Sequence, residues 1–339
     1  MQPLTDEPTQ RPPRRRRMSA DGAPRIVEVA ILAAIVVLPL VVRDQATIER
    51  FGGYLLLAVF AISVDLIWGY GGMLTFGHAV FFGGGAYVVA ILTTRDAGFL
   101  PLPYWAAFIV AIGAAALLAV ALGAFVFSGR VGLRGVEFAV VTLAVAVLAE
   151  RIAAAGGVVT GGRNGILMDS RFGIPGLFSF HRGLGFYVFA ALVLIATYLG
   201  ARRFVASRTG LIVRGIRENE DRVGLLGYDV PRTKSMVFMV SAMIAAGAGS
   251  LFYTQLGIVA PAAVGVAAST SVLLWVALGG RGTLLGPIVG AMVLPYLNST
   301  LSSGRLLDTW LVVVGVLLVV VILVLPAGIF GFLDRGSDE

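Results

Sequence analysis

Cysteine is absent from this chain of 339 residues, and histidine occurs only at His78 and His181. Without cysteine there can be no disulfide bond, thiol nucleophile or thiolate metal site. Two histidines are too few for a multi-histidine centre, so we expect no bound metal. The G-x-x-x-x-G-K-[ST] phosphate-binding loop is also missing. We therefore expect this chain neither to hydrolyse ATP nor to carry a cofactor of its own.

Charged residues are scarce as well, at 13% of the chain, whereas soluble domains carry about 25%. Hydrophobic residues make up 58%. This composition predicts an all-α integral membrane protein in contact with lipid. The 44 glycines are expected where helices approach through small-residue faces. The net charge of +7 does not indicate nucleic-acid binding, because the basic residues flank apolar runs, where membrane topology explains them.

Apolar runs predict about ten transmembrane helices, with nine or eight as alternatives, because a spanning helix needs about 20 residues and several runs are shorter. The runs lie at 26–42, 52–68, 79–94, 104–127, 136–153, 185–201, 235–256, 268–279, 286–301 and 310–326. The glycine-rich linker GGRGTLLG splits the runs at 268–279 and 286–301, so we expect broken or re-entrant helices there. The predicted domains are a disordered basic cytoplasmic tail at 1–25, a transmembrane domain at 26–332 and a cytoplasmic tail at 333–339.

The basic residues predict the orientation. With the N-terminus inside, the segments 1–25, 128–135, 202–234, 280–285 and the C-terminal tail face the cytoplasm, and they hold 18 of the 26 Lys and Arg residues. Such an excess is typical of cytoplasmic segments. Both termini are therefore expected in the cytoplasm.

The most charged of these segments is 202–234, with eight basic and four acidic residues. Between residues 207 and 227 the spacing predicts one amphipathic helix that starts near Gly210 and ends at Gly227. Its apolar positions are Ile212, Ile216, Val223 and Leu226, and its charged face holds the i,i+4 pairs Arg214–Glu218, Arg217–Asp221 and Glu218–Arg222. The apolar face of such a helix needs a partner or a membrane surface. The alternative is an ordinary positively charged loop.

Two glycine-rich stretches are candidates for a translocation pathway. They are WGYGGMLTFGHAVFFGGGAY at 68–87 and LGGRGTLLGPIVG at 278–290. Glycine permits local unwinding, although close helix packing is the alternative for any single glycine. Asp65 is either a structural partner of a backbone break or a pathway residue, and His78 is either a hydrogen-bonded structural residue or a proton carrier. The candidate pathway residues are Asp65, Gly71, Gly72, Thr75, His78, Gly83, Gly84, Gly279, Gly280, Arg281, Gly282 and Thr283.

These motifs resemble the permease subunits of branched-chain amino acid ABC importers, and in particular the LivM-type subunit. The resemblance is carried by the stretch at 68–87, by TGGRNGI at 160–166, by SRTGLIVRGIRENEDRVGLLGYDV at 207–230 and by the C-terminal motifs, and it covers about residues 54–332. It implies a bacterial inner-membrane protein with a second permease, two cytoplasmic ATPases that bind ATP and Mg, and an external solute-binding protein. The residues that it implies for ATPase coupling are Gly210, Ile212, Arg214, Ile216, Arg217, Glu218, Asn219, Glu220, Asp221, Arg222 and Val223.

The solute implied by the resemblance is a branched-chain amino acid, with urea or a short amide as the alternative. The motifs DLIWGY at 65–70 and YTQLGIVAP at 253–261 are similar to those of the urea branch, whereas GLRGVEFAVVTLAVA at 132–146 is similar to those of the amino acid branch. A membrane enzyme is disfavoured because Asp65 and His78 have no third catalytic partner. A secondary transporter or channel would suit the broken helices but not a charged docking loop.

The predicted topology can be tested with reporter fusions. A reporter that works only in the cytoplasm should be active when it is fused after Gly215 or after Phe332, and silent when it is fused at Gly173. The expected pattern follows from the excess of positive charge in the inside segments. Activity at Gly173 would contradict the ten-helix topology and the cytoplasmic placement of the charged loop.

Overall fold

The computed structural model describes residues 44–94, 102–127, 135–168, 172–174, 178–180 and 183–302, together with some residues between 28 and 42. The predicted tails at 1–25 and 333–339 lie outside these residues, as does the apolar run at 310–326.

Helices make up nearly all of the described chain. The long ones are α2 (Gln45–Val64), α3 (Ala79–Thr93), α4 (Tyr104–Phe127), α5 (Val136–Ala155), α7 (Leu184–Ala206), α10 (Val230–Leu256), α11 (Val266–Gly279) and α12 (Leu285–Ser302). The shorter ones are the π-helix η1 (Asp65–Tyr70), α6 (Gly157–Thr160), the 3-10 helices η3 (Gly162–Asn164) and η4 (Pro261–Val264), α8 (Arg208–Glu218) and α9 (Glu220–Leu225). Four short strands form two antiparallel pairs: β1 (Ile166–Leu167) with β4 (Ile258–Val259), and β2 (Phe172–Ile174) with β3 (Phe178–Phe180).

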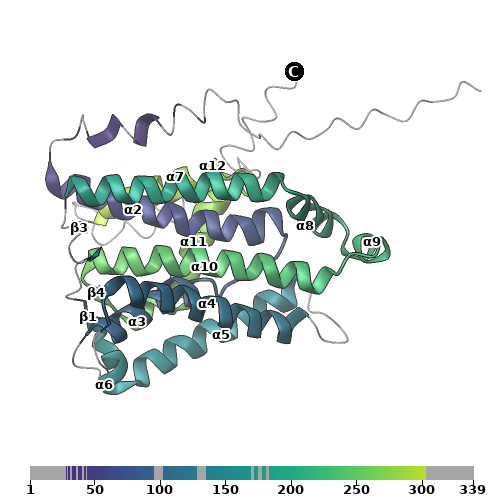
Figure 1. Ribbon diagram of the computed structural model, residues 1–339, viewed down its shortest axis with the longest axis horizontal. Helices are drawn as coiled ribbons and strands as arrows, with labels where there is room; N and C mark the ends of the chain where they lie inside the picture. The colour runs from purple at the N-terminus through teal and green to yellow at the C-terminus, as the bar shows by residue number, and fades with distance from the viewer. Residues whose placement is uncertain are drawn as a thin grey trace, which may run out of the picture.

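The long helices lie side by side in one bundle, as Figure 1 shows. Helices α8 and α9 lie at one end of the bundle, which we call the α8 end, and β1, β4 and α6 lie at the opposite end. Two described residues of the run predicted at 26–42 contact α7: Glu28 forms an ion pair with Arg202, and the Ile35 carbonyl accepts from the Tyr187 hydroxyl at 2.6 Å. Glu28 is thereby placed at the end of α7 that leads into α8.

Within the described residues, five helices are long and apolar enough to cross a membrane: Gln45–Tyr70, Tyr104–Phe127, Val136–Ala155, Leu184–Ala206 and Val230–Leu256. Helices α3 and α11 are apolar but have only 15 and 14 residues. At 1.5 Å per residue they reach about 22 and 21 Å, less than the hydrocarbon core of about 30 Å. Eight of the ten predicted apolar runs form helices in the described chain, and the count of ten transmembrane helices stays a prediction.

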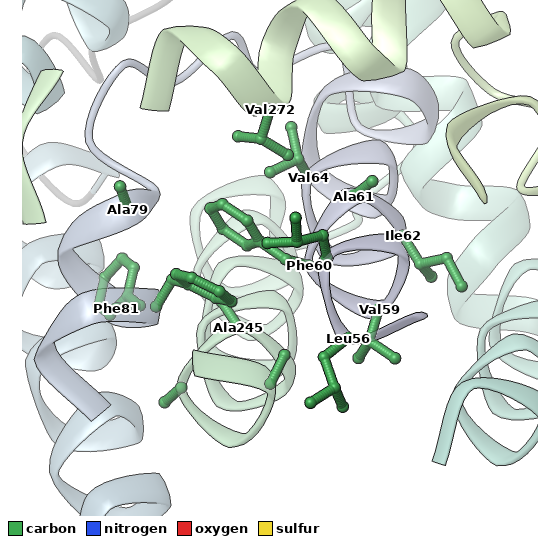
Figure 2. Packing of buried hydrophobic residues seen from close by; sticks show 14 of the residues in the cluster. Leu56, Val59, Phe60, Ala61, Ile62, Val64, Ala79, Phe81, Ala245 and Val272 are labelled. Atoms are coloured by element: carbon green, nitrogen blue, oxygen red, sulfur yellow. The ribbon is translucent and has the colours of Figure 1, made fainter. Parts of the chain in front are cut away.

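Helix α2 is the centre of the bundle. Of its most apolar 18-residue window, 83% is buried inside the chain, against 28% for the windows of α4 and α5. The Phe60 ring of α2 stacks on Phe82 of α3 with 4.2 Å between centroids. Figure 2 shows Val64 of α2 beside Val272 of α11, with Phe60 pointing toward α3 and α10. Packing around α2 therefore fixes where this helix ends, and the candidate site begins there.

Glycines allow α3 and α10 to cross in close contact. A Cβ at Gly249 would lie 1.8 Å from the Phe82 carbonyl oxygen, and one at Gly85 would lie 2.5 Å from the Ala246 carbonyl oxygen. Both distances are far shorter than a van der Waals contact. At these two positions, close helix packing explains the glycine.

This crossing generates a stability prediction with a control on the same helix. Gly249→Ala should lower the thermal unfolding temperature in detergent, because overpacking of a close contact costs about 1–3 kcal/mol. Gly247→Ala should leave it within error, since a Cβ there would lie 3.6 Å from the nearest atom of Phe108. Tryptophan fluorescence would follow the unfolding. Equal unfolding temperatures for the two variants would contradict the close crossing.

Candidate functional site at the α8 end

The site begins where α2 loses its regular helical geometry. After Val64 the chain forms the π-helix η1 and then runs without helical structure from about residue 72 to residue 78, before α3 begins. Gly72 has φ +70°, a left-handed conformation that favours glycine. The predicted helix break in the stretch 68–87 is therefore present, and π-helical turns within helices are frequent at functional sites.

Hydroxyl groups from other helices hold this non-helical segment. The Thr142 hydroxyl oxygen of α5 accepts from the Phe76 N–H at 3.1 Å, and the Ser269 hydroxyl oxygen of α11 accepts from the Ala79 N–H at 3.0 Å. Thr75 accepts locally from the Gly77 N–H at 3.2 Å. Non-helical backbone within a membrane protein is stable only where such partners exist.

His78 is fully buried beside aromatic rings. Its Nε2 is 2.8 Å from the Ser241 hydroxyl, which donates to the Ser63 carbonyl, so the imidazole is the donor in the first of these bonds. The ring stacks near Phe60 at 6.1 Å and meets Phe81 edge-on at 5.6 Å. Nδ1 is buried and has no hydrogen-bond partner in the described part of the chain. These contacts favour the structural alternative for His78.

Asp65 is fully buried and uses both carboxylate oxygens. Oδ1 accepts from the Gly282 N–H at 2.6 Å, and Oδ2 accepts from the Leu284 N–H at 3.1 Å. Both donors belong to the turn between α11 and α12. Leu284 has φ +58°, which costs a residue with a side chain about 1–2 kcal/mol, so this turn needs external support. Asp65 is thus a structural partner of a backbone break, but of the break at 280–284.

Arg217 of α8 reaches the same place from the other side. Its Nη1 donates to the Gly69 carbonyl of η1. A Cβ at Gly282 would lie 3.3 Å from the Gly69 carbonyl oxygen and 3.4 Å from Arg217 Nη1. Three segments far apart in the sequence therefore meet at one point, which we call the junction: η1 with Asp65 and Gly69, the turn with Gly282 and Leu284, and Arg217.

Two cation–π contacts surround the junction. The Arg214 guanidinium lies 5.3 Å from the centroid of the Tyr70 ring, and the Arg281 guanidinium lies 5.9 Å from the centroid of the Trp68 ring. Contacts of this kind contribute about 0.5–1 kcal/mol at exposed sites. These contacts add to the hydrogen bonds of Arg217 and Asp65, which also connect α8 and the α11–α12 turn to η1.

The charged segment forms two helices, so the prediction of one helix over 207–227 is wrong. Asn219 ends α8 and caps α9, because its side-chain oxygen accepts from the Arg222 N–H at 2.9 Å. The break interrupts the predicted i,i+4 series between Arg214 and Arg222. Gly227 follows α9 with φ +86°, as predicted for a helix end, whereas Gly210 lies inside the first turn of α8, after the N-cap Ser207. We call Arg208–Leu225 the α8–α9 unit.

The predicted apolar face packs inside this chain. Ile216, Val223 and Val230 form a buried cluster with Ile212 at its edge, whereas Leu226 is 70% exposed. The partner of the face is the first turn of α10, which begins at Val230 and not after residue 234 as predicted. Lys234 of the same helix also binds Glu220 at 2.6 Å. In the α8–α9 unit and the loop that follows it, the large apolar side chains that stay exposed are Leu211, Leu225, Leu226 and Tyr228.

The candidate pathway residues divide into two groups. Most lie in η1, in the 71–78 segment or in the α11–α12 turn, and Asp65 joins η1 to the turn. Gly83 instead packs against η4, because a Cβ there would lie 2.5 Å from the Ala263 carbonyl oxygen, and Gly84 faces open space. Gly279 packs against Gly286, with 1.9 Å from a Cβ to the Gly286 carbonyl oxygen. Thr283 bonds within its own turn, to Gly280 and Gly286.

Sequence reasoning missed the hydroxyl groups that hold the break, which are those of Thr142, Ser241 and Ser269. Thr142 and Ser241 are single polar residues within apolar runs, and Ser269 belongs to the short polar group Ser269–Ser271, so none of them carries a periodic signal. The inward direction of Arg217 was also missed. Among the described residues, no group of three or more Asp, Glu or His side chains could hold a metal ion.

A bundle of apolar helices with broken segments and a charged helical unit at one end defines a polytopic membrane protein. Residues 52–322 match the model of the family described as the branched-chain amino acid transport system / permease component. This match covers most of the chain, which belongs to that family of transport permeases.

Curated relatives agree with this assignment. The chain is 27% identical over 288 residues to the high-affinity branched-chain amino acid transport system permease protein LivM of Escherichia coli K12, with 78% of this chain and 66% of LivM covered. It is 32% identical over 146 residues to LivH of the same organism, with 42% of this chain and 47% of LivH covered. The autoinducer 2 import system permease protein LsrC of Enterobacter sp. strain 638 is 32% identical over 146 residues, with 40% and 42% covered. The chain thus spans about two thirds of the length of LivM, and no solved structure matches.

The role of Asp65 in the turn can be measured directly. Asp65→Ala should leave the half-buried Gly282 N–H and the buried Leu284 N–H without an acceptor, and a buried group in this state costs about 1–3 kcal/mol. Asp65→Asn keeps one acceptor oxygen and should lose less. Amide hydrogen exchange across residues 280–286 should accelerate strongly in the alanine variant and moderately in the asparagine variant.

Asp44→Ala is the matched control, because Asp44 is an exposed cap at the opposite end of α2. It should leave exchange at 280–286 unchanged. Unaltered exchange in Asp65→Ala would contradict the assigned hydrogen bonds.

Proposed function

We propose that this chain is a permease subunit of an ABC importer that moves branched-chain, hydrophobic amino acids across the cytoplasmic membrane of a bacterium. ATP would be hydrolysed on separate subunits. The observation that carries this proposal is the family match over residues 52–322, together with the alignment to LivM across 78% of the chain.

The proposed assembly pairs this chain with a second permease, two cytoplasmic ATPases that bind ATP and Mg, and an external solute-binding protein. LivM and LivH carry the name of one transport system, and the chain is similar to both. Such similarity supports a pair of related permeases. The described residues leave large faces of α4 and α5 uncovered, and these faces are proposed to contact lipid or the second permease.

We place the α8 end in the cytoplasm, with both termini on that side. Two of the segments that the positive charges assign to the inside, 202–234 and 280–285, lie together at this end through the contact of Arg217 with η1 and of Asp65 with the turn. Glu28, at the start of the first apolar run, meets Arg202 there as well. The agreement of these independent segments supports the orientation.

The α8–α9 unit is the proposed docking element for an ATPase. Ile216 and Val223 are already buried against Val230, so they stabilise the unit from inside. Contact with the ATPase then falls to the exposed apolar side chains, of which Leu225 is 90% exposed and Leu226 is 70% exposed. Charges on the exposed side of the unit would set the register of docking. Alternating access would move the candidate pathway residues around the solute.

The alternative function is import of urea or a short amide by the same kind of assembly. The family does not fix the solute, because the relatives include an autoinducer 2 import permease as well as LivM and LivH. A secondary transporter or channel is less favoured, since its family would not be that of an ABC importer permease.

The decisive experiment is uptake by proteoliposomes that contain this chain and its cognate permease, ATPases and binding protein. Leucine uptake should require ATP and should not be competed by urea. Uptake of urea but not leucine would replace the proposed solute by the alternative. Uptake of leucine without ATP would reject the importer.

In the same system Leu225→Ser should reduce ATPase copurification and uptake by at least tenfold, because it removes an exposed apolar contact. Leu256→Ser is the matched control, a leucine that is 55% exposed at the end of α10 away from α8. It should retain both activities. Equal behaviour of the two variants would remove the α8–α9 unit from the proposed interface.

A further inference from the structure

We propose that Arg217 and Asp65 form a rigid link through which the α8–α9 unit moves together with η1 and the α11–α12 turn. Arg217 is then a positioning residue, because it acts on the solute route through η1. This inference rests on the proposed function, and it names the path by which movement of the docking element would reach the transmembrane core.

The hydrogen bonds of the proposed link join segments that are far apart in the sequence. Helix α8 also packs against α7 and α10, but these are its own neighbours along the chain. The hydrogen bond from Arg217 to Gly69 joins residues 148 positions apart, and the bond from Gly282 to Asp65 joins residues 217 positions apart. These two bonds connect the α8–α9 unit to the end of the central helix, and that end to the α11–α12 hairpin.

The chemistry of the link is suited to holding a helix end. The last turn of a helix has carbonyl groups without intrahelical N–H partners and carries a partial negative charge. The Arg217 guanidinium donates to one of these carbonyls, that of Gly69, and the resulting hydrogen bond is charge-assisted. Four residues before Gly69, the buried Asp65 carboxylate accepts charge-assisted bonds from the N–H groups of Gly282 and Leu284. The guanidinium and the carboxylate therefore flank the same glycine, Gly282.

The segments of the junction are in close contact at Gly69 and at Gly72. A Cβ at Gly69 would lie 2.0 Å from Asp65 Oδ1 and 2.5 Å from the Gly282 nitrogen. A Cβ at Gly72 would lie 2.9 Å from Arg217 Cγ. Segments packed this closely transmit displacement, because protein interiors have low compressibility. Movement of α8 is thereby passed to η1 and to the turn as one body.

The absence of cysteine allows a direct test by covalent replacement of the link. A Cβ at Gly72 would lie 3.3 Å from the Arg217 Cβ, close to the usual 3.5–4.5 Å between disulfide Cβ atoms. The double variant Gly72→Cys with Arg217→Cys should therefore form a disulfide that ties α8 to η1. The readout is the ratio of solute-stimulated to basal ATP hydrolysis in the full complex, together with uptake.

Arg217→Ala should lower this ratio to about one and reduce uptake at least tenfold, while Arg217→Lys should retain part of both. The oxidised double-cysteine variant should regain at least half of the wild-type ratio and lose it again on reduction. Each single-cysteine variant should be insensitive to reductant. Arg203→Ala, which changes an exposed arginine in the last turn of α7 outside the α8–α9 unit, should keep the wild-type ratio.

Several results would overturn the link. They are a wild-type ratio in Arg217→Ala, a disulfide that forms without restoring the ratio, unchanged amide exchange at 280–286 in Arg217→Ala, and loss of ATPase copurification in Arg217→Ala. Failure of the proposed function is a different result, namely wild-type complex without ATP-dependent uptake. In that case disulfide formation in the isolated permease, and amide exchange at 280–286 in Arg217→Ala, still decide whether the link exists.

Discussion

A buried carboxylate between apolar helices is the constraint on which this end of the molecule depends. Asp65 has no access to solvent, so each of its oxygens needs a donor, and Gly282 and Leu284 provide them. The turn between α11 and α12 accepts a leucine in the left-handed region because this carboxylate holds its backbone. Gly69 must be glycine because the carboxylate and the turn occupy the space where its side chain would lie. Arg217 then meets a helix end whose position is already set.

Much of the helical architecture could be predicted from the sequence, because apolar runs in a membrane protein have few structural solutions. The breaks after α2 and between α11 and α12 were also predictable, since glycines gather at both. The extent of the charged helix was not. Asn219 reads as an ordinary polar position in a helix, yet its side chain caps α9 and so divides the segment. The periodicity of the charged segment revealed an apolar face, but it did not reveal that Val230 of the same chain would cover this face.

Contacts within the candidate site were beyond sequence reasoning for a different reason. Asp65 was recognised as an ionisable residue within an apolar run, and Arg217 was listed only among the coupling residues. Their partners are backbone groups of Gly282, Leu284 and Gly69, and a backbone group leaves no mark on the sequence. Distance along the chain adds to the difficulty, because no local pattern relates residue 65 to residue 282. The close contacts that require glycine at the junction can therefore be recognised only in the folded structure, where the three segments meet.

The late position of the α11–α12 turn has a consequence for biosynthesis. Asp65 enters the membrane with the second apolar run, whereas its partners at Gly282 and Leu284 lie more than 200 residues later. At about 5–20 residues per second, translation needs roughly 10–40 s to supply them. During that interval the Asp65 carboxylate lacks both of its native hydrogen-bond donors. A charged group costs about 2.5–3.5 kcal/mol at the centre of a membrane-spanning helix, which is the upper bound for a residue near a helix end. The end of α2 is thus completed only when the last described helices arrive, although α2 is among the first helices made.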